Sequence, residues 1–121
     1  MQYLTKPVVY FEDSDFDSNG NFIQPNKPVF ILLQSLKCYH CTNAKPAFQE
    51  FADRNPNILC GTIQIDSPQM TSEFLQKIDN FIYPNLVGFP SYIAYHHYGQ
   101  KTVYNGDRSV KNMEQFFSTL N

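Results

Sequence analysis

Residues 29–41 read VFILLQSLKCYHC, an apolar run that leads directly to a pair of cysteines. Five consecutive apolar residues, 29–33, are typical of a strand that is buried on both faces of a sheet. After the cysteine pair, apolar side chains recur at the spacing of one helix face, at residues 41, 44, 48 and 51. This stretch therefore predicts a buried strand that delivers a C-x-x-C motif to the start of a helix.

The flanking sequence predicts alternating strands and helices. Strands are expected at residues 8–11 and 58–65, and residues 92–98 and 101–104 flank a turn at Gly99, as in a hairpin. Between them, Ser67 is the expected N-cap of a helix with Pro68 at its first position. That helix would carry an apolar stripe at residues 70, 74, 75 and 78 and end before Pro84. Ser109 is expected to cap a last helix.

This order of elements predicts one α/β domain over residues 1–121. A mixed central sheet with helices on both faces buries the apolar side of every element. The stretch 17–28 contains Asn19-Gly20, Pro25 and Pro28, and it is expected to be a solvated connector with at most one short helical turn.

Composition narrows the function classes. Apolar residues make up 42% of the 121 residues, aromatic residues 16%, and the net charge is −2, which is typical of a folded domain and not of a nucleic-acid binder. No run of about 18 apolar residues occurs, so no membrane segment is expected. The absence of a secretory signal pattern predicts a cytoplasmic protein, with packaging into a particle or another compartment as the alternative.

The residues Cys38-Tyr39-His40-Cys41 carry the chemistry. A two-residue spacer at a helix start lets two sulfurs approach the bonding distance of ~2.0 Å. The helix N-terminus favours a thiolate, so Cys38 is the expected nucleophile and Cys41 the residue that resolves the mixed disulfide. Such a redox-active disulfide needs no metal or organic cofactor.

A zinc site is the main alternative for these cysteines. Structural zinc needs four ligands, and the remaining candidates are Cys60, His96 and His97, without a second C-x-x-C pair. Cys60 is expected to be a small buried side chain in a strand. The pattern therefore predicts no metal site, and Thr42 stands where a c-type haem motif would need histidine.

The chain resembles the thioredoxin superfamily over nearly its whole length. Pro46 follows the second cysteine by five residues, Asp66 ends a strand, and Gly88-Phe89-Pro90 is similar to the loop whose proline is cis in this family. The resemblance implies a thioredoxin fold and a thiol–disulfide oxidoreductase that acts on protein disulfides or dithiols. It also implies that Pro90 packs beside the sulfurs and that the Phe89 backbone pairs with substrate. A recycling partner, either a reductase, glutathione or an oxidase, is expected, and the sequence does not identify it.

Departures from the family pattern modify these expectations. Lys37 replaces the usual Trp before the motif, and it is either a residue that lowers the pKa of Cys38 or a solvated surface lysine. Leu32 occupies the position of a buried carboxylate that takes the proton of the second cysteine, which predicts slower resolution. His40 resembles the disulfide isomerase spacer and predicts a higher redox potential, whereas Tyr39 is expected to narrow access to Cys38. The alternative function is a redox-weak binding or adaptor module on the same scaffold.

Overall fold

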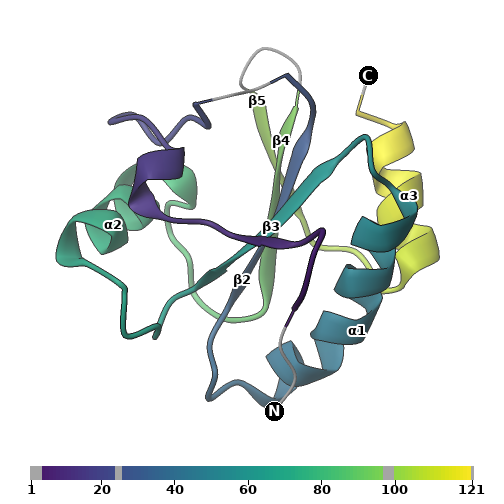
Figure 1. Ribbon diagram of the computed structural model, residues 1–121, viewed down its shortest axis with the longest axis horizontal. Helices are drawn as coiled ribbons and strands as arrows, with labels where there is room; N and C mark the ends of the chain where they lie inside the picture. Colours follow the sequence, from purple (N-terminus) through teal and green to yellow (C-terminus); the bar gives the residue numbers. More distant parts are fainter. Residues whose placement is uncertain (1–3, 24–25, 97–99, 121) are drawn as a thin grey trace.

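The computed structural model describes residues 4–23, 26–96 and 100–120, which form a five-stranded mixed sheet in the order β1-β3-β2-β4-β5 (Figure 1). The first three strands of this order are parallel, β4 is antiparallel to β2, and β5 is antiparallel to β4. The strands are β1 (Val9–Tyr10), β2 (Val29–Gln34), β3 (Leu59–Gln64), β4 (Ser91–His96) and β5 (Gln100–Tyr104). The predicted mixed α/β architecture is confirmed.

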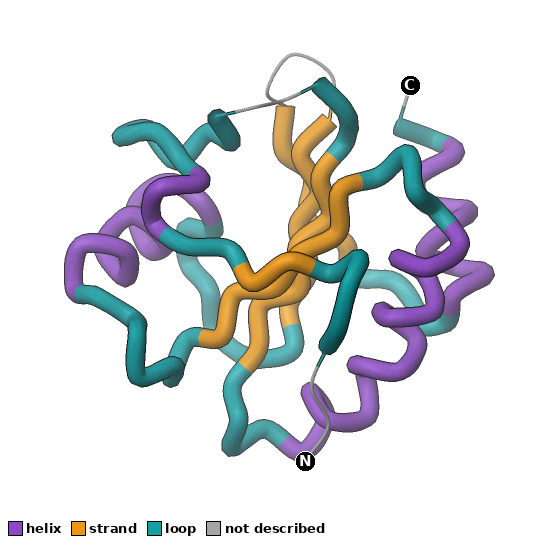
Figure 2. The backbone as a smooth tube through the Cα atoms, viewed as in Figure 1, coloured by secondary structure: helices purple, strands orange, loops and turns teal. Residues whose placement is uncertain are grey.

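Helices cover both faces of the sheet (Figure 2). One face carries α1 (Tyr39–Arg54) and α3 (Val110–Ser118), and the other carries α2 (Ser72–Lys77), the π-helical turn η2 (Ile78–Ile82) and the 3-10 turn η1 (Asp13–Asp15). The side chains of β2 alternate between these layers. Phe30 and Leu32 face α1 and α3, whereas Ile31 and Leu33 face α2, and all four are fully buried. The central strand is therefore buried on both faces, as its continuous apolar run predicts.

Helices α1 and α3 begin where the sequence predicts. Cys38 is the N-cap of α1, Pro46 lies inside this helix, and the predicted inward face at residues 41, 44, 48 and 51 is buried. Ser109 caps α3 through a hydrogen bond from Asn112 N–H to its Oγ, at 3.2 Å. Local capping chemistry thus fixes both helix starts.

The predicted start of the second helix is wrong. Instead of Ser67, Thr71 is the N-cap, and its Oγ1 accepts a hydrogen bond from Phe74 N–H at 3.1 Å. The Ser67 Oγ accepts from the nearby Gln69 N–H at 3.2 Å, so this serine closes a local turn and does not cap a helix. The helix then widens into the π-helical turn η2 and ends before Pro84, as expected.

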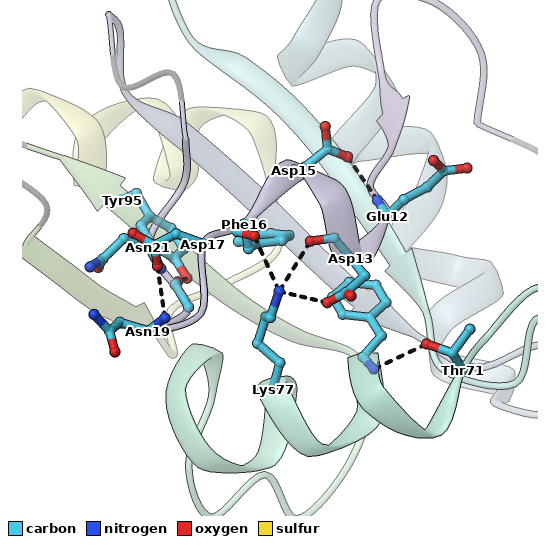
Figure 3. Close-up of polar contacts among 12 residues, drawn as sticks. Glu12, Asp13, Asp15, Phe16, Asp17, Asn19, Asn21, Thr71, Lys77 and Tyr95 are labelled. Atoms are coloured by element: carbon cyan, nitrogen blue, oxygen red, sulfur yellow. Dashed lines mark hydrogen bonds and ion pairs between the residues drawn. The ribbon is translucent and has the colours of Figure 1, made fainter.

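The prediction that residues 17–28 form a solvated connector is confirmed in part: the described residues of this stretch form a loop and most are exposed, but Gly20 is buried and Phe22 is half-buried. Within the described part of this stretch, Phe22 packs edge-on against Phe16 with ring centroids 5.6 Å apart, and the Tyr95 hydroxyl donates to Gly20 O at 2.6 Å. The residues just before this stretch are held by Lys77 of α2. The Lys77 Nζ lies 2.7 Å from Asp13 Oδ1 and donates a hydrogen bond to Phe16 O at 3.1 Å (Figure 3). Residues 12–23 therefore cover the α2 side of the sheet. The rings of Phe16 and Phe22 pack in the hydrophobic core on that side.

The predicted hairpin forms between β4 and β5, while its turn at Gly99 and the residue His97 lie outside the described residues. His96 ends β4, and its Nε2 lies 2.7 Å from Thr102 Oγ1 on β5. Cys60 is buried in β3, as predicted. No helix in the described ranges is long and apolar enough to cross a membrane.

Candidate active site

The two cysteines of the motif lie where β2 passes into α1 and differ in exposure. Cys38 precedes the first turn of α1 and is partly exposed, whereas Cys41 points inward and is fully buried. Cys38, Cys41 and Cys60 are free thiols in this structure. The outer and inner positions match the predicted order, with the more accessible sulfur first in the chain.

The Cys38 sulfur lies between two backbone groups. It accepts a hydrogen bond from Cys41 N–H at 3.2 Å, and its thiol donates to the carbonyl oxygen of Phe89 at 3.3 Å. The Phe89–Pro90 peptide bond is cis, as expected, and Pro90 is buried. The fold thereby brings the segment before β4 against the start of α1, and the Cys38 sulfur lies within hydrogen-bond distance of a backbone donor and a backbone acceptor.

Burial dominates the chemistry of Cys41. Desolvation raises the pKa of its thiol to about 12, and the side-chain contact with Cys38 acts in the same direction. A hydrogen bond with the Ser35 backbone and the charge of Lys45 both lower this pKa without reversing the shift. Cys41 is therefore a thiol near neutral pH, and it must lose a proton before it acts as a nucleophile.

The loop between β2 and α1 is fastened by Asp66, which follows β3. Its carboxylate accepts hydrogen bonds from Leu36 N–H at 3.1 Å and from Ser35 Oγ at 3.0 Å. Desolvation tends to raise the pKa of Asp66, but these hydrogen bonds outweigh it and the pKa lies below its usual value. Asp66 is thus a strand-end residue that positions the loop before Cys38, as its place in the sequence suggested.

Comparison with known proteins shows the family. No family model matches the sequence. The thioredoxin-like protein 453L of invertebrate iridescent virus 6 is 38% identical over an alignment of 109 residues, and the match covers 78% of this chain and 79% of that protein. The chain belongs to the thioredoxin-like proteins.

Solved structures agree with this thioredoxin-like assignment at the level of fold. The Trx4 domain of ERdj5 matches with a TM-score of 0.71 and 14% identity, covering 92% of each chain. The J-Trx1 fragment of ERdj5 matches with a TM-score of 0.70 and 21% identity, over 92% of this chain but 50% of the fragment. Human ERp44 matches with a TM-score of 0.66 and 15% identity over 96% of this chain, which spans 30% of the ERp44 chain.

The residues that flank Cys38 in this thioredoxin-like protein are exposed. Tyr39 is 73% exposed, and its ring lies edge-on to that of His40, with centroids 5.7 Å apart. Lys37 is exposed as well, and its charge contributes to the low pKa of Asp66. Tuning of Cys38 by these three residues stays a prediction.

Sequence reasoning missed two polar groups near Cys41 in this thioredoxin-like protein. Lys45, one helical turn after Cys41, is only 2% exposed, and the buried Tyr92 hydroxyl makes no hydrogen bond within the described residues. The inward spacing from residue 41 to 45 was the available signal for Lys45. No three His, Cys, Asp or Glu side chains gather into a metal-ion site in the described ranges 4–23, 26–96 and 100–120.

Proposed function

We propose that this protein is a thiol–disulfide oxidoreductase that acts on protein disulfides or dithiols. The observation that carries the proposal is the pairing of a partly exposed Cys38 thiol at a helix N-terminus with the buried Cys41 behind it. The helix start provides unpaired N–H groups that favour the thiolate, which is the reactive form of cysteine. The thioredoxin-like description of the viral relative supports the same assignment.

The proposed reaction is a pair of exchanges at sulfur. The Cys38 thiolate attacks one sulfur of a substrate disulfide, the new Cys38–substrate bond forms, and the other substrate sulfur leaves as a thiolate and takes a proton. Cys41 then attacks Cys38, and the second substrate thiol is released. The protein loses two electrons and two protons and keeps a Cys38–Cys41 disulfide, and the reverse sequence oxidises a dithiol substrate.

The substrate is proposed to bind as an extended segment along residues 87–90. The Phe89 carbonyl lies at the Cys38 sulfur, so backbone pairing at this position would bring a substrate disulfide to the nucleophile. Three apolar side chains flank this point and are exposed, namely Leu36 at 39%, Tyr39 at 73% and Val87 at 98%. These side chains favour apolar residues beside the substrate disulfide.

Catalytic turnover needs a partner that resets the cysteine pair. The proposed partner is a reductase or glutathione if the protein reduces its substrates, and an oxidase if it forms disulfides. The chemistry itself uses only sulfur atoms, and no metal or organic cofactor is required for it. A reducing compartment such as the cytosol favours the first direction.

Reduction of insulin by dithiothreitol tests the proposal. The wild-type protein is expected to accelerate the precipitation of reduced insulin chains, and Cys38→Ser is expected to abolish this acceleration. Cys41→Ser is expected to accumulate a mixed disulfide with a substrate, which mass spectrometry detects, because the resolving sulfur is lost. Equal acceleration by wild type and Cys38→Ser would overturn the proposal.

The second candidate function is an adaptor module that binds clients with little redox turnover. Two departures from the thioredoxin pattern favour this function. Leu32, which is fully buried, replaces the carboxylate of thioredoxins and disulfide isomerases, and Lys37 replaces Trp. Binding of a reduced client peptide separates the two candidates. If the protein is an adaptor, Cys38→Ser keeps its affinity for the client peptide and its function. If the protein is an oxidoreductase, the same variant loses its disulfide-exchange activity.

A further inference from the structure

Buried polar side chains gather on the α1 face of the sheet beneath the cysteine motif. Gln34, Lys45 and Thr62 are each at most 2% exposed and come from β2, α1 and β3. The Gln34 side chain donates to Thr62 Oγ1 at 2.8 Å, and Thr62 Oγ1 donates to Leu32 O at 2.7 Å. Gln34 and Thr62 therefore form a chain of hydrogen bonds to the backbone of Leu32, the residue at the position where thioredoxins and disulfide isomerases carry a buried carboxylate.

The lysine of this group lies one turn after the resolving cysteine. Residues four apart on a helix are neighbours on the same face, and helical side chains lean toward the N-terminus. Lys45 therefore lies on the same face of α1 as Cys41, and it is near enough to interact electrostatically with that thiol. Because Lys45 is 2% exposed, its charge acts from inside the protein, where an ionic interaction is screened less than at the surface.

A second polar group approaches the same sulfur from the sheet. Tyr92 pairs with Leu32 across β2 and β4, and its side chain is 3% exposed. Its hydroxyl is buried without a hydrogen-bond partner among the described residues, and it interacts electrostatically with Cys41. A neutral thiol is a poor acceptor, whereas a thiolate attracts both an ammonium group and a hydroxyl donor.

These groups lie near the sulfur that must ionise in the resolving step of the proposed reaction. Burial opposes ionisation of Cys41, and Leu32 supplies no base to take its proton. The charge of Lys45 lowers the pKa of Cys41, while Cys38 and Tyr92, the other described titratable groups that interact with it, bear no positive charge. Lys45 is therefore the cation identified at this sulfur within the described residues.

We propose that the Lys45 ammonium stabilises the Cys41 thiolate during resolution, with the Tyr92 hydroxyl as an auxiliary donor, so that a buried cation replaces the carboxylate base. The proposal rests on the proposed function. In this step Cys41 forms a bond with Cys38, the Cys38–substrate bond breaks, and the electron pair of that bond leaves on the substrate sulfur. The proton lost by Cys41 ends on this leaving thiolate, through solvent, so no further reactant is needed.

Single-turnover reaction with 5,5′-dithiobis(2-nitrobenzoate) tests the proposal. With less than one equivalent of this reagent per chain, attack by Cys38 releases the first coloured thiolate, and resolution by Cys41 releases the second. Lys45→Met is expected to slow the second release by about tenfold or more near neutral pH and to shift its pH dependence upward, because a neighbouring charge shifts a pKa by one or more units. The first release is expected to stay within about twofold of wild type.

Matched variants separate an effect of charge from an effect of structure. Lys45→Arg retains the charge and is expected to restore most of the second rate, whereas Lys45→Gln is expected to behave like Lys45→Met. Lys111→Met makes the same change on the exposed surface of α3 and is expected to leave both phases and their pH dependence unchanged. Tyr92→Phe is expected to slow only the second phase, and less than Lys45→Met does.

The two proposals fail in different ways. Absence of the first release in the wild-type protein would overturn the proposed function. A normal first release together with a second release that has the same rate and pH dependence in Lys45→Met, or in Lys45→Gln if the Met variant does not fold, would overturn the role of Lys45 alone.

Discussion

The Cys38 thiol donates a hydrogen bond to the Phe89 carbonyl oxygen at 3.3 Å across 51 residues of sequence. This contact joins the first turn of α1 to the segment that leads into β4, so the nucleophilic sulfur and a backbone acceptor share one surface. An extended substrate that paired with the Phe89 backbone would place its own sulfur beside Cys38. In the proposed oxidoreductase, this contact would place the nucleophile beside the edge at which substrate binds.

The three thiols are expected to differ in their reactivity toward iodoacetamide near neutral pH. Cys38 is partly exposed and should be labelled, whereas Cys41 and Cys60 are buried and burial raises the pKa of each to about 12. Intact mass after brief labelling of the reduced protein should show one adduct under native conditions and three in urea. Labelling of Cys41 as fast as Cys38 in the native state would contradict the arrangement of the site.

Stability is expected to fall in alkaline solution. The pKa values of Cys41 and Cys60 rise from about 9 in the unfolded chain to about 12 in the folded one. Between these two pH values, the folded state therefore binds more protons than the unfolded state. Their contribution is complete below about pH 9 and decreases as the pH rises toward 12. The urea midpoint should therefore be lower at about pH 11 than at about pH 8, and Cys60→Ala should reduce this difference. If the urea midpoint fell by the same amount between these two pH values in wild type and in Cys60→Ala, the contribution of Cys60 to the pH dependence would be refuted.

His40 is expected to raise the redox potential of the Cys38–Cys41 pair. His40 lies in the first turn of α1, two residues after Cys38, and a positive charge at this position would stabilise the reduced form. Titration in glutathione buffers should give a potential near the disulfide isomerase value of about −180 mV, and His40→Ala should move it toward the thioredoxin value of about −270 mV.

A suitable control for His40 is His96→Ala. The neighbouring Tyr95 pairs with Val29, so His96 lies at the end of β2 that is remote from the cysteines. A wild-type potential near −270 mV would refute the role of His40, and the lack of a reversible titration would favour the adaptor function.

Asp66 is expected to stabilise the loop before Cys38. Asp66→Ala removes the acceptor for Leu36 N–H and Ser35 Oγ and should lower the free energy of unfolding by about 1–2 kcal/mol. Hydrogen exchange at the Leu36 amide should accelerate. Because the folded pKa of Asp66 is depressed, its contribution is present above the unfolded pKa of about 4 and is lost as the pH falls through the folded value. Asp79→Ala, an exposed carboxylate on η2, is the control, and an equal effect of both variants would refute this role.

Lys77 is expected to hold residues 12–23 against α2. Its ammonium contacts Asp13 O, Asp13 Oδ1 and Phe16 O, and hydrogen bonds to charged groups contribute about 1.5–3 kcal/mol. Lys77→Met should lower the free energy of unfolding by about this amount and speed proteolysis within residues 12–23. Lys111→Met should do neither, and equal stability of the two variants would argue against the contacts in Figure 3.

Much of the fold and the core of the site follow from short-range patterns. The continuous apolar run predicted a central strand, the inward spacing from Cys41 predicted α1, and Ser109 predicted the start of α3. The assignment failed at Ser67, which closes a local turn, whereas Thr71 caps the helix. The assignment was incomplete around Phe22, because polar turn residues indicate a loop without indicating whether one of its side chains packs on a core.

The sequence by itself determined that a C-x-x-C motif follows a buried strand and begins a helix, because capping, strand burial and helical periodicity depend on neighbouring residues. Only the tertiary structure decided what surrounds the two sulfurs. The Phe89 carbonyl reaches Cys38, and Tyr92 reaches the region of Cys41, through the pairing of β2 with β4. Burial of Lys45 depends likewise on the packing of α1 against the sheet, since a helical spacing states which side chains share a face but not how deeply that face is covered.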